Sequence, residues 1–495
     1  MSGVVVEKKI MKKTVVEQGI LEGLPAADPR ITVFKGVPFA KPPVGKLRWA
    51  PPQDPDKWEG VRQAFDFAPI PPQPAPAERP NDDDLYGKEW AVDAGIQVNE
   101  DCLYLNVWSP AKFYKDKVEA DKKYPVYFWI FGGGWQCGHS AEMEFDGERI
   151  ARRGIVVVTI NYRVNLFGFL SHPEITKEYP GRAANFGLQD QRKALEWVYK
   201  NISAFGGDPE NITIGGQSAG GGSVVYQMLY EQKPKLIKRS IVESGMFINP
   251  FMGMFPRHTL KDAEDLGVKF FEFCGVKTLA EARELSTDFL RQKWSDWGGW
   301  ATSAQTWGPI EDGVFNKGDL YDRLKTGEIE FPPIMTGFTT DEFNAGPKGC
   351  KEDEIISTVE LGIRKMHLLE EANGFKNKNY FYKFDVPIPG WDNAGKFHSV
   401  DLWFFFESLA KCWRPFKGVH YDMARQICNY LCNFVKTGNP NGKDAFNDFP
   451  YSKESDYDEL PKWDTYSTEK PNVMVFTEKC ECKDYPASDN LKKYL

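Results

Sequence analysis

Short apolar runs alternate with amphipathic stretches along most of the chain after residue 124. Residues 124–131 and 154–162 are almost continuously apolar, which is typical of strands buried on both faces of a sheet. Residues 188–202 carry apolar side chains at helical spacing, and Gly206-Gly-Asp-Pro209 would end such a helix. Shorter runs predict further strands at residues 211–214, 239–242, 333–336, 380–384 and 473–476. Alternating strands and helices predict an α/β fold, with a mostly parallel sheet covered on both faces.

One stretch, residues 69–84 (PIPPQPAPAERPNDDD), is rich in proline and acidic residues. Proline fixes φ and lacks an N–H donor, so we expect a surface loop here. Too little chain precedes this loop to form a core of its own, so residues 1–495 are expected to form a single domain. A last helix, with Met423, Ile427, Leu431 and Phe434 on one face, is predicted to end at Gly438.

Composition and charge narrow the class of protein. The 495 residues include 62 Lys and Arg against 70 Asp and Glu, and 41% are hydrophobic, which is enough for a large core. A net charge of −8 argues against a nucleic-acid or anionic-membrane partner. No run approaches the ~18–20 apolar residues of a membrane-spanning helix. Lysines interrupt the apolar runs of the first 23 residues, so no secretory signal is expected.

The nine cysteines are an odd number without the spacing of a disulfide framework. We therefore expect free thiols and a cytoplasmic protein. Neither Cys428-xxx-Cys432 nor Cys480-x-Cys482 has a second Cys or His pair at zinc spacing, so no metal site is predicted.

The segment Gly216-Gln-Ser218-Ala-Gly220 is the most informative motif. A predicted strand precedes it and a helical pattern follows it, which is the context of a nucleophile elbow. Glycines on both sides of the serine allow a sharp turn without Cβ clashes. A phosphate-binding loop of the Walker type would require Gly-Lys-Ser/Thr, and no lysine occurs here. Ser218 is therefore the predicted nucleophile.

A serine nucleophile needs a base and an acid, which in elbow hydrolases follow it in the order acid, then histidine. Of the six histidines, His398 is favoured because it lies in a Gly-rich loop after the predicted strand at 380–384. His139 and His172 precede the serine, His258 follows it too closely, and His367 lies in a charged stretch typical of a solvated helix face. His420 sits just before the last helix. For the acid, Asp341, Glu342 and Asp312 all remain open on position alone.

Several motifs in order resemble the type-B carboxylesterase family, which also contains the cholinesterases. They are Phe34-Lys-Gly-Val-Pro-Phe-Ala40, Glu100-Asp-Cys-Leu-Tyr-Leu-Asn-Val107, Asn185-Phe-Gly-Leu-Gln-Asp-Gln191, Phe205-Gly-Gly-Asp-Pro209, the Ser218 elbow and Thr437-Gly-Asn-Pro-Asn441. The resemblance implies an α/β-hydrolase fold with helical insertions around the active site. It also implies a serine carboxylesterase that needs no cofactor or metal and acts on small-molecule esters.

The same resemblance implies roles for particular residues. Glu342 matches the family's acid in Gly337-Phe-Thr-Thr-Asp-Glu342, and His398 matches its base. The backbone N–H groups of Gly133, Gly134 and Ala219 match the family's oxyanion hole. Many members have His or Tyr where this chain has Phe131, so a side-chain hydrogen bond that supports the glycine loop is expected to be lost.

Secreted relatives pair a cysteine like Cys102 with an upstream cysteine, and none precedes Cys102 here. This difference supports the expectation of a cytoplasmic protein.

Aromatic residues cluster near the predicted site in the sequence, and most are expected in the core. Trp135, Trp300 and Trp307 are hypothesised to line an apolar pocket that favours aromatic or short-to-medium acyl esters. Two alternatives to ester hydrolysis stay open. The family includes inactive adhesion proteins, and an acyl-enzyme can also transfer its acyl group to another alcohol or amine.

Overall fold

The computed structural model describes most of the chain. The described residues are 11–74, 85–90, 95–114, 117–119, 122–230, 236–248, 258–300, 307–346, 349–444 and 458–495. Most of the predicted loop at residues 69–84 therefore lies outside them. Its first part is not a surface loop, because Ile70 and Gln73 are buried.

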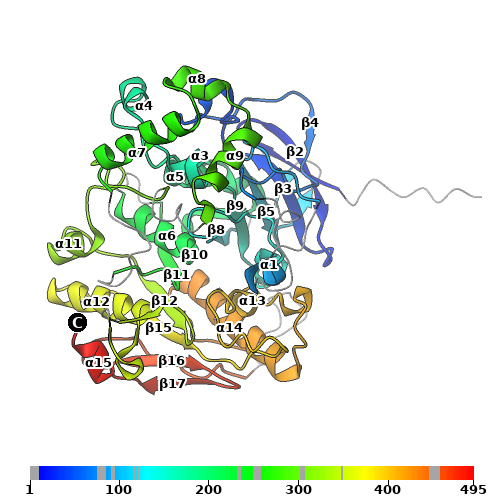
Figure 1. The fold of residues 1–495 in the computed structure, drawn as a ribbon. Helices are drawn as coiled ribbons and strands as arrows, with labels where there is room; N and C mark the ends of the chain where they lie inside the picture. Colours follow the sequence, from blue (N-terminus) through cyan, green and yellow to red (C-terminus); the bar gives the residue numbers. More distant parts are fainter. Residues whose placement is uncertain are drawn as a thin grey trace, which may run out of the picture.

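A sheet of 13 strands runs through the described residues (Figure 1). Its strands are β1 (Lys12–Val16), β2 (Gly19–Pro25), β3 (Thr32–Pro38), β4 (Val61–Gln63), β5 (Tyr104–Ser109), β8 (Tyr124–Ile130), β9 (Val156–Ile160), β10 (Gly207–Gln217), β11 (Arg239–Glu243), β12 (Ile334–Thr339), β15 (Asn379–Phe384), β16 (Asn472–Phe476) and β17 (Cys480–Asp484). The order is β1-β2-β3-β5-β9-β8-β10-β11-β12-β15-β16-β17, with β4 beside β2. Two small hairpins, β6 (Phe113–Tyr114) with β7 (Lys117–Val118) and β13 (Asn344–Ala345) with β14 (Ile356–Ser357), lie outside it.

The centre of the sheet is parallel and its edges are antiparallel. Neighbouring strands from β9 through β8, β10, β11, β12 and β15 to β16 are parallel. The pairs from β1 to β9 on one side, and β16 with β17 on the other, are antiparallel. The strands predicted from continuous apolar runs all belong to the parallel part, where both faces are covered.

Helices cover the sheet and extend beyond it. They are α1 (Leu85–Trp90), α2 (Glu148–Ala151), α3 (Asn165–Phe169), α4 (Pro173–Glu178), α5 (Phe186–Asn201), α6 (Ala219–Leu229), α7 (Leu260–Phe273), α8 (Leu279–Glu284), α9 (Thr287–Asp296), α11 (Leu320–Lys325), α12 (Thr358–Ala372), α13 (Leu402–Phe405), α14 (Gly418–Thr437) and α15 (Asp489–Lys492). Helices α4, α7, α8 and α9 gather together at the top of Figure 1. Helix α14 ends at Gly438, whose φ of 78° is the left-handed conformation expected there.

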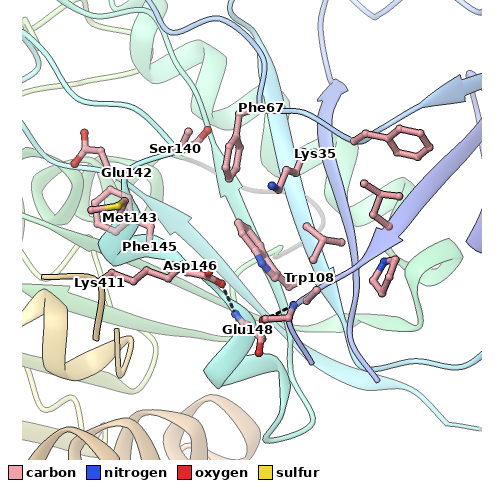
Figure 2. Close-up of a pocket in the computed structure, with 17 residues that line it drawn as sticks. Lys35, Phe67, Trp108, Ser140, Glu142, Met143, Phe145, Asp146, Glu148 and Lys411 are labelled. Carbon is pink, nitrogen blue, oxygen red and sulfur yellow. Dashed lines mark hydrogen bonds and ion pairs between the residues drawn. The ribbon is translucent and has the colours of Figure 1, made fainter. Parts of the chain in front are cut away.

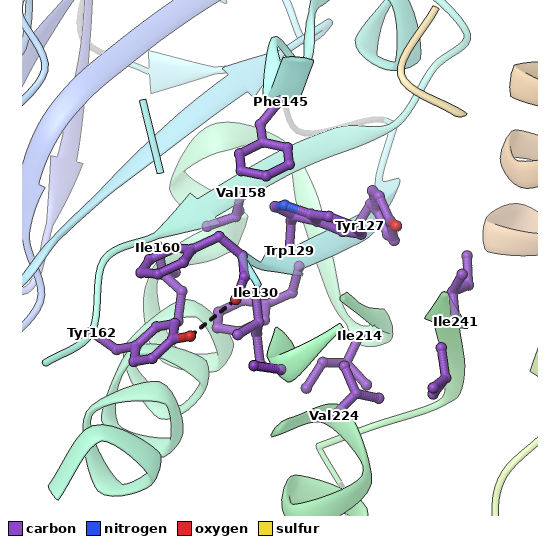
Figure 3. Close-up of a cluster of buried hydrophobic side chains, with 14 of the residues drawn as sticks. Tyr127, Trp129, Ile130, Phe145, Val158, Ile160, Tyr162, Ile214, Val224 and Ile241 are labelled. Carbon is purple, nitrogen blue, oxygen red and sulfur yellow. Dashed lines mark hydrogen bonds between the residues drawn. The ribbon is translucent and has the colours of Figure 1, made fainter. Parts of the chain in front are cut away.

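Alternate residues of β10 face opposite layers of helices. The Thr213 hydroxyl donates to the Val435 carbonyl of α14, while the neighbouring Ile214 lies beside Val224 of α6 (Figure 3). Because successive side chains of a strand point to opposite faces, α6 and α14 lie on opposite sides of the sheet. The core on both sides includes fully buried residues of β8, such as the successive Phe128 and Trp129, which point to opposite faces.

The prediction of a solvated His367 was wrong. This histidine lies on α12 with 1% of its surface exposed, and its Nδ1 is 2.9 Å from the Asn379 amide nitrogen. Burial lowers the pKa of His367 to about 3, so the imidazole is neutral in the folded protein. The charged residues that flank His367 in the sequence made this stretch resemble a solvated helix face, although His367 itself is on the buried face of α12.

Candidate active site

Ser218 lies at the turn between β10 and α6, as the elbow motif predicts. Its backbone angles are φ 55° and ψ −126°, which lie outside the regions favoured by L-residues, and its N–H donates to the Glu243 carbonyl at 2.9 Å. Strain of this kind persists only where the surrounding structure imposes it, and it is typical of functional sites. The serine stands at the N-terminus of α6, where the helix dipole favours negative charge.

The flanking glycines are required by close packing around the turn. A Cβ atom on Gly220 would lie 2.1 Å from the Ile130 carbonyl oxygen of β8. A Cβ atom on Gly216 would lie 2.5 Å from the Gly220 carbonyl carbon. Neither space accommodates a methyl group, so the glycines allow β8, β10 and α6 to meet at the serine.

His398 and Glu342 are joined by a short hydrogen bond. The imidazole Nδ1 lies 2.5 Å from Glu342 Oε2, and the Thr339 N–H donates to Glu342 Oε1 at 2.8 Å. Glu342 lies three residues after the end of β12, and His398 lies in the loop after β15, so two neighbouring parallel strands bring them together. Both carboxylate oxygens are engaged, which fixes the orientation of Glu342 toward the ring.

The other imidazole nitrogen points toward the elbow. Nε2 of His398 lies 3.3 Å from the side-chain nitrogen of Gln217, the residue immediately before Ser218. With Nδ1–H donated to Glu342, Nε2 is unprotonated and accepts a hydrogen bond from the Gln217 amide. Nε2 is thus the nitrogen that is available as a base, and it lies on the side of the nucleophile.

The alternative acids and bases have other partners. Asp341 accepts the Lys396 N–H at 2.8 Å, and Asp312 accepts the Asn185 amide at 2.9 Å. The His172 side chain caps α4. The His420 side chain accepts the Lys417 N–H at the start of α14. Of the candidates weighed from the sequence, these contacts therefore support Glu342 and His398.

The glycine loop after β8 borders the serine. Gly133 and Gly134 have φ angles of 103° and 60°, and a Cβ atom on Gly132 would lie 3.1 Å from Ser218 Cβ. Their N–H groups donate no hydrogen bond to any residue within the described part of the chain. Two unengaged donors beside the nucleophile are the arrangement that an oxyanion hole requires.

Phe131 does not leave the glycine loop without support. Its ring stacks on Tyr162 with centroids 4.3 Å apart, and the Tyr162 hydroxyl donates to the Phe131 carbonyl at 3.0 Å (Figure 3). Gln73 forms a second support, because its amide pairs with both the N–H and the carbonyl of Gly138 at 2.8 and 2.9 Å. Gln73 was not predicted as a support, because it lies in the segment expected at the surface.

The three tryptophans of the hypothesised pocket lie in different surroundings. Trp135 is buried, and its indole N–H donates to the Ser223 hydroxyl of α6 at 2.9 Å. Trp307 is also buried and packs edge-on against Phe270 of α7. Trp300 is 48% exposed, and a Cβ atom on Gly134 would lie 2.9 Å from its ring. Trp300 therefore covers the candidate oxyanion loop.

Two further carboxyl groups are buried behind the His398–Glu342 pair. Asp401 accepts the Tyr382 hydroxyl at 3.0 Å, and burial together with the nearby Glu342 raises the pKa of Asp401 to about 7. Burial, with Asp401 nearby, also raises the pKa of Glu243 well above its usual value. Among these three acids, Glu342 is the one that is hydrogen-bonded to the imidazole.

A separate surface pocket of about 320 Å³ contains none of the predicted site residues (Figure 2). Lys35 lies 4.4 Å from the Phe67 ring centroid, Trp108 forms part of the wall, and Lys411 pairs with Asp146 at the rim. The acidic side chains of the lining outnumber its two lysines, so the pocket presents no clear charge for a ligand.

Neither a metal cluster nor a membrane span is found in the described part of the chain. No group of three or more His, Cys, Asp and Glu side chains there is placed to hold a metal ion. No helix among the same residues is long and apolar enough to cross a membrane.

Comparison with known proteins agrees with the motifs. The sequence matches the carboxylesterase family over residues 12–358 and 351–493. It is 39% identical to a para-nitrobenzyl esterase of Bacillus subtilis over 93% of this chain and 94% of the relative. A fumonisin B1 esterase of Sphingopyxis macrogoltabida is 33% identical, over 68% of this chain but only 57% of its own length. The structure of a Geobacillus stearothermophilus carboxylesterase, EST55, superposes with a TM-score of 0.76 at 28% identity, covering 98% of this chain and 100% of the other.

The fold is that of the α/β-hydrolases, which confirms the fold class expected from the sequence. The chain belongs to the carboxylesterase family, and its named relatives are carboxylic ester hydrolases.

Proposed function

We propose that this chain is a serine carboxylesterase that hydrolyses carboxylic esters through an acyl-enzyme on Ser218. The observation that carries the proposal is the His398–Glu342 hydrogen bond, whose imidazole presents Nε2 beside the strained Ser218 turn. Family membership supports the reaction type, and the geometry supports the assignment of roles to these three residues.

The proposed reaction uses the imidazole as both base and acid. Nε2 of His398 takes the Ser218 proton while Oγ attacks the ester carbonyl, and it then returns that proton to the departing alcohol. The imidazole next activates a water molecule that releases the acid and frees the serine. Glu342 holds the Nδ1–H tautomer and stabilises the imidazolium that forms in each half-reaction. To accept the serine proton, Nε2 exchanges its contact with the Gln217 amide for one with Oγ.

The developing oxyanion would be held by three backbone donors. Gly133 and Gly134 supply N–H groups from the loop after β8, and Ala219 supplies the first N–H of α6, which has no partner within its helix. The positive end of α6 adds to the stabilisation. Loss of one such donor typically lowers the rate by about 10²–10³.

The substrate class is proposed to be aromatic or short-to-medium acyl esters. Trp300 over Gly134 would place an aromatic surface next to the reacting carbonyl, while Trp135 and Trp307 would shape the pocket from behind it. Rates on acetate, butyrate and feruloyl esters test this preference, with Trp300→Ala as the variant. Equal or better turnover of short polar esters would contradict it.

Transfer of the acyl group to another acceptor is the second candidate reaction, because the same acyl-enzyme serves both. Product analysis with added alcohol separates transesterification from hydrolysis. An inactive binding module is disfavoured, because the chain keeps the elbow serine and its candidate imidazole and carboxylate are hydrogen-bonded to each other. A cytoplasmic location is also proposed, supported by the finding that the structure forms no disulfide among the cysteines it describes.

Turnover of p-nitrophenyl esters tests the proposed function. Ser218→Ala is expected to lose nearly all activity, whereas Ser203→Ala, at an exposed serine of the same protein, keeps it. Both variants are expected to unfold at the wild-type temperature. Substantial ester turnover by Ser218→Ala would exclude the proposed nucleophile.

A further inference from the structure

Arg414 is a buried guanidinium that none of the steps above uses. Its side chain has 0% exposure, and its Nε donates to both oxygens of Glu89 at 3.1 Å. Its two terminal nitrogens donate to the two oxygens of Asp392 at 3.0 Å each, and one also donates to the Pro389 carbonyl at 3.2 Å. Paired planar contacts of this kind fix both distance and orientation.

The two carboxylates belong to separate parts of the chain. Glu89 lies on α1, whereas Asp392 lies in the loop 389–397, which ends at His398. Arg414 therefore connects α1 to the loop that precedes the candidate base.

Glu89 is itself held by several donors around Arg414. The indole N–H groups of Trp403 and Trp413 donate to it at 3.0 Å each, and the Cys412 thiol donates at 3.3 Å. Trp403 lies on α13, just beyond His398 in the chain. These three donors hold the Glu89 carboxylate in place even without Arg414. Glu89 is therefore a rigid support for the guanidinium.

Aromatic rings extend the same contacts to the residue next to His398. The Arg414 guanidinium carbon lies 5.0 Å from the Phe397 ring centroid and 4.6 Å from that of Trp413. Tyr86 of α1 also packs edge-on against Phe397, with ring centroids 6.4 Å apart. Phe397 is covalently bonded to His398, so its packing directly constrains the backbone of the candidate base.

The loop 389–397 has no regular secondary structure that would place His398 by itself. Asn393 and Gly395 have φ angles of 50° and 67°, in the left-handed region. Asp341 fixes the end of the loop next to His398, because its backbone N–H and its carboxylate both pair with Lys396. Arg414 fixes the far end, away from His398, through Asp392 and Pro389.

We propose that Arg414 is a positioning residue for His398. Arg414 is held by Glu89 of α1 and in turn fixes the loop 389–397. The imidazole of His398 can then contact Glu342 and face the Ser218 turn. The proposal rests on the proposed function, because it assigns Arg414 a role through the candidate base. A loop that is free at its far end would let the ring move away from Glu342, and the cost would fall on the chemical step rather than on substrate binding.

The steady-state kinetics and phosphonylation rates of three variants test this proposal. Arg414→Met keeps most of the side-chain length but removes the guanidinium. Asp392→Asn weakens only the link to the loop and leaves the buried Arg414–Glu89 pair intact. Arg364→Met is the matched control, because Arg364 on α12 forms another buried ion pair, with Glu360 at 2.7 Å, away from the loop.

We expect Arg414→Met to lower kcat by about 10–100-fold with KM within about threefold, because small displacements of a catalytic group have effects of this size. Phosphonylation of Ser218 should slow in parallel. Asp392→Asn should show a smaller loss of kcat, again with little change in KM. Arg364→Met should lower the melting temperature without changing kcat.

Unchanged kcat in both Arg414→Met and Asp392→Asn would overturn the proposal. An equal loss of kcat in Arg364→Met would also overturn it, because a general loss of stability would then explain the effect. If Arg414→Met does not fold, Asp392→Asn alone decides between these outcomes. Failure of the proposed function itself is distinguishable, because it would appear as ester turnover that survives Ser218→Ala.

Discussion

At the scale of single residues, Asp341 and Glu342 show how position divides two similar acids between different tasks. They are adjacent in the sequence, yet Glu342 is hydrogen-bonded to the His398 imidazole and Asp341 to the Lys396 backbone. The first acid is placed to support the reaction, and the second holds the loop. Sequence position alone left both open, because it does not determine which way each side chain turns after β12.

Glu342→Gln is expected to lower kcat by about 10³–10⁴, since the amide keeps an oxygen for the Thr339 N–H but loses the charge that stabilises the imidazolium. Asp341→Asn serves as the comparison, because its remaining oxygen still accepts the Lys396 N–H. We expect less than a tenfold loss there. Steady-state kinetics on a p-nitrophenyl ester measure both variants. A larger loss in Asp341→Asn than in Glu342→Gln would reverse the assignment.

The supports of the candidate site were harder to predict than its reactive groups. Ser218 has a local signature, because the elbow needs glycines at fixed offsets. Gln73 and Tyr162 support the glycine loop through backbone carbonyls and N–H groups of distant residues, and such contacts leave no pattern in the sequence. Phe131, which stands where many family members have His or Tyr, illustrates this limit. The expected loss of one side-chain hydrogen bond is accompanied by a different one from Tyr162.

At the scale of elements, the site depends on the close meeting of β8, β10 and α6. Gly220 lies where α6 meets the end of β8, and a side chain there would collide with backbone atoms of Ile130 and Phe131. Backbone atoms in a sheet cannot move aside as a flexible side chain can. The elbow is therefore a packing requirement of three elements as well as a motif.

Gly220→Ala is expected to destabilise the protein by about 3 kcal/mol or more, because overpacking against backbone forces these elements apart. Activity should fall with it, since the Ser218 turn shifts. Gly418→Ala is the control at the first residue of α14, where nothing lies within 4 Å of the added methyl group. Urea unfolding should place that variant within about 0.5 kcal/mol of the wild type. Equal stability of the two variants would contradict this account of the elbow.

The parallel strands were predictable from the sequence, whereas most of the antiparallel edge was not. Strands β8, β9 and β12 are buried on both faces and read as continuous apolar runs. Strands β1 and β2 lie at an edge with mixed exposure, and lysine and glutamate interrupt their apolar positions. The alternation there is too weak to predict strands, which instead depend on pairing, β1 with β2 and β2 with β3 and β4.

At the scale of the whole molecule, one sheet includes strands from residue 12 to residue 484, which supports the proposed single domain. A single cooperative thermal transition, followed by both fluorescence and circular dichroism, is the expected result. Two separate transitions would argue for independent domains.

Buried carboxyl groups make the stability of the fold depend on pH. Asp401 has a pKa of about 7 in the folded protein, against an ordinary value of 3.8. Between these values the folded state holds a proton that the unfolded state has lost. The contribution of Asp401 to the free energy of unfolding is therefore full below about pH 4 and is lost as the pH rises through about 7. Buried His367, with its lowered pKa, contributes the opposite slope on the acid side.

Asp401→Asn should remove the Asp401 part of this dependence, because the amide cannot ionise and its oxygen still accepts the Tyr382 hydroxyl. From pH 5 to pH 8, the free energy of unfolding of the wild type should fall relative to that of the variant. The fall should be on the order of 1 kcal/mol or more, since one pKa unit corresponds to about 1.4 kcal/mol. Urea unfolding at the two pH values measures the difference. The same difference between wild type and variant at both pH values would contradict a neutral Asp401 in the folded state.

The most direct test of the whole account is mass spectrometry of the protein after reaction with an organophosphonate. We predict one adduct per chain, located on Ser218 by peptide mapping, formed more slowly by at least about 10²-fold in His398→Gln. An adduct on another residue, or labelling of Ser218 at the wild-type rate without the imidazole, would contradict the proposed site.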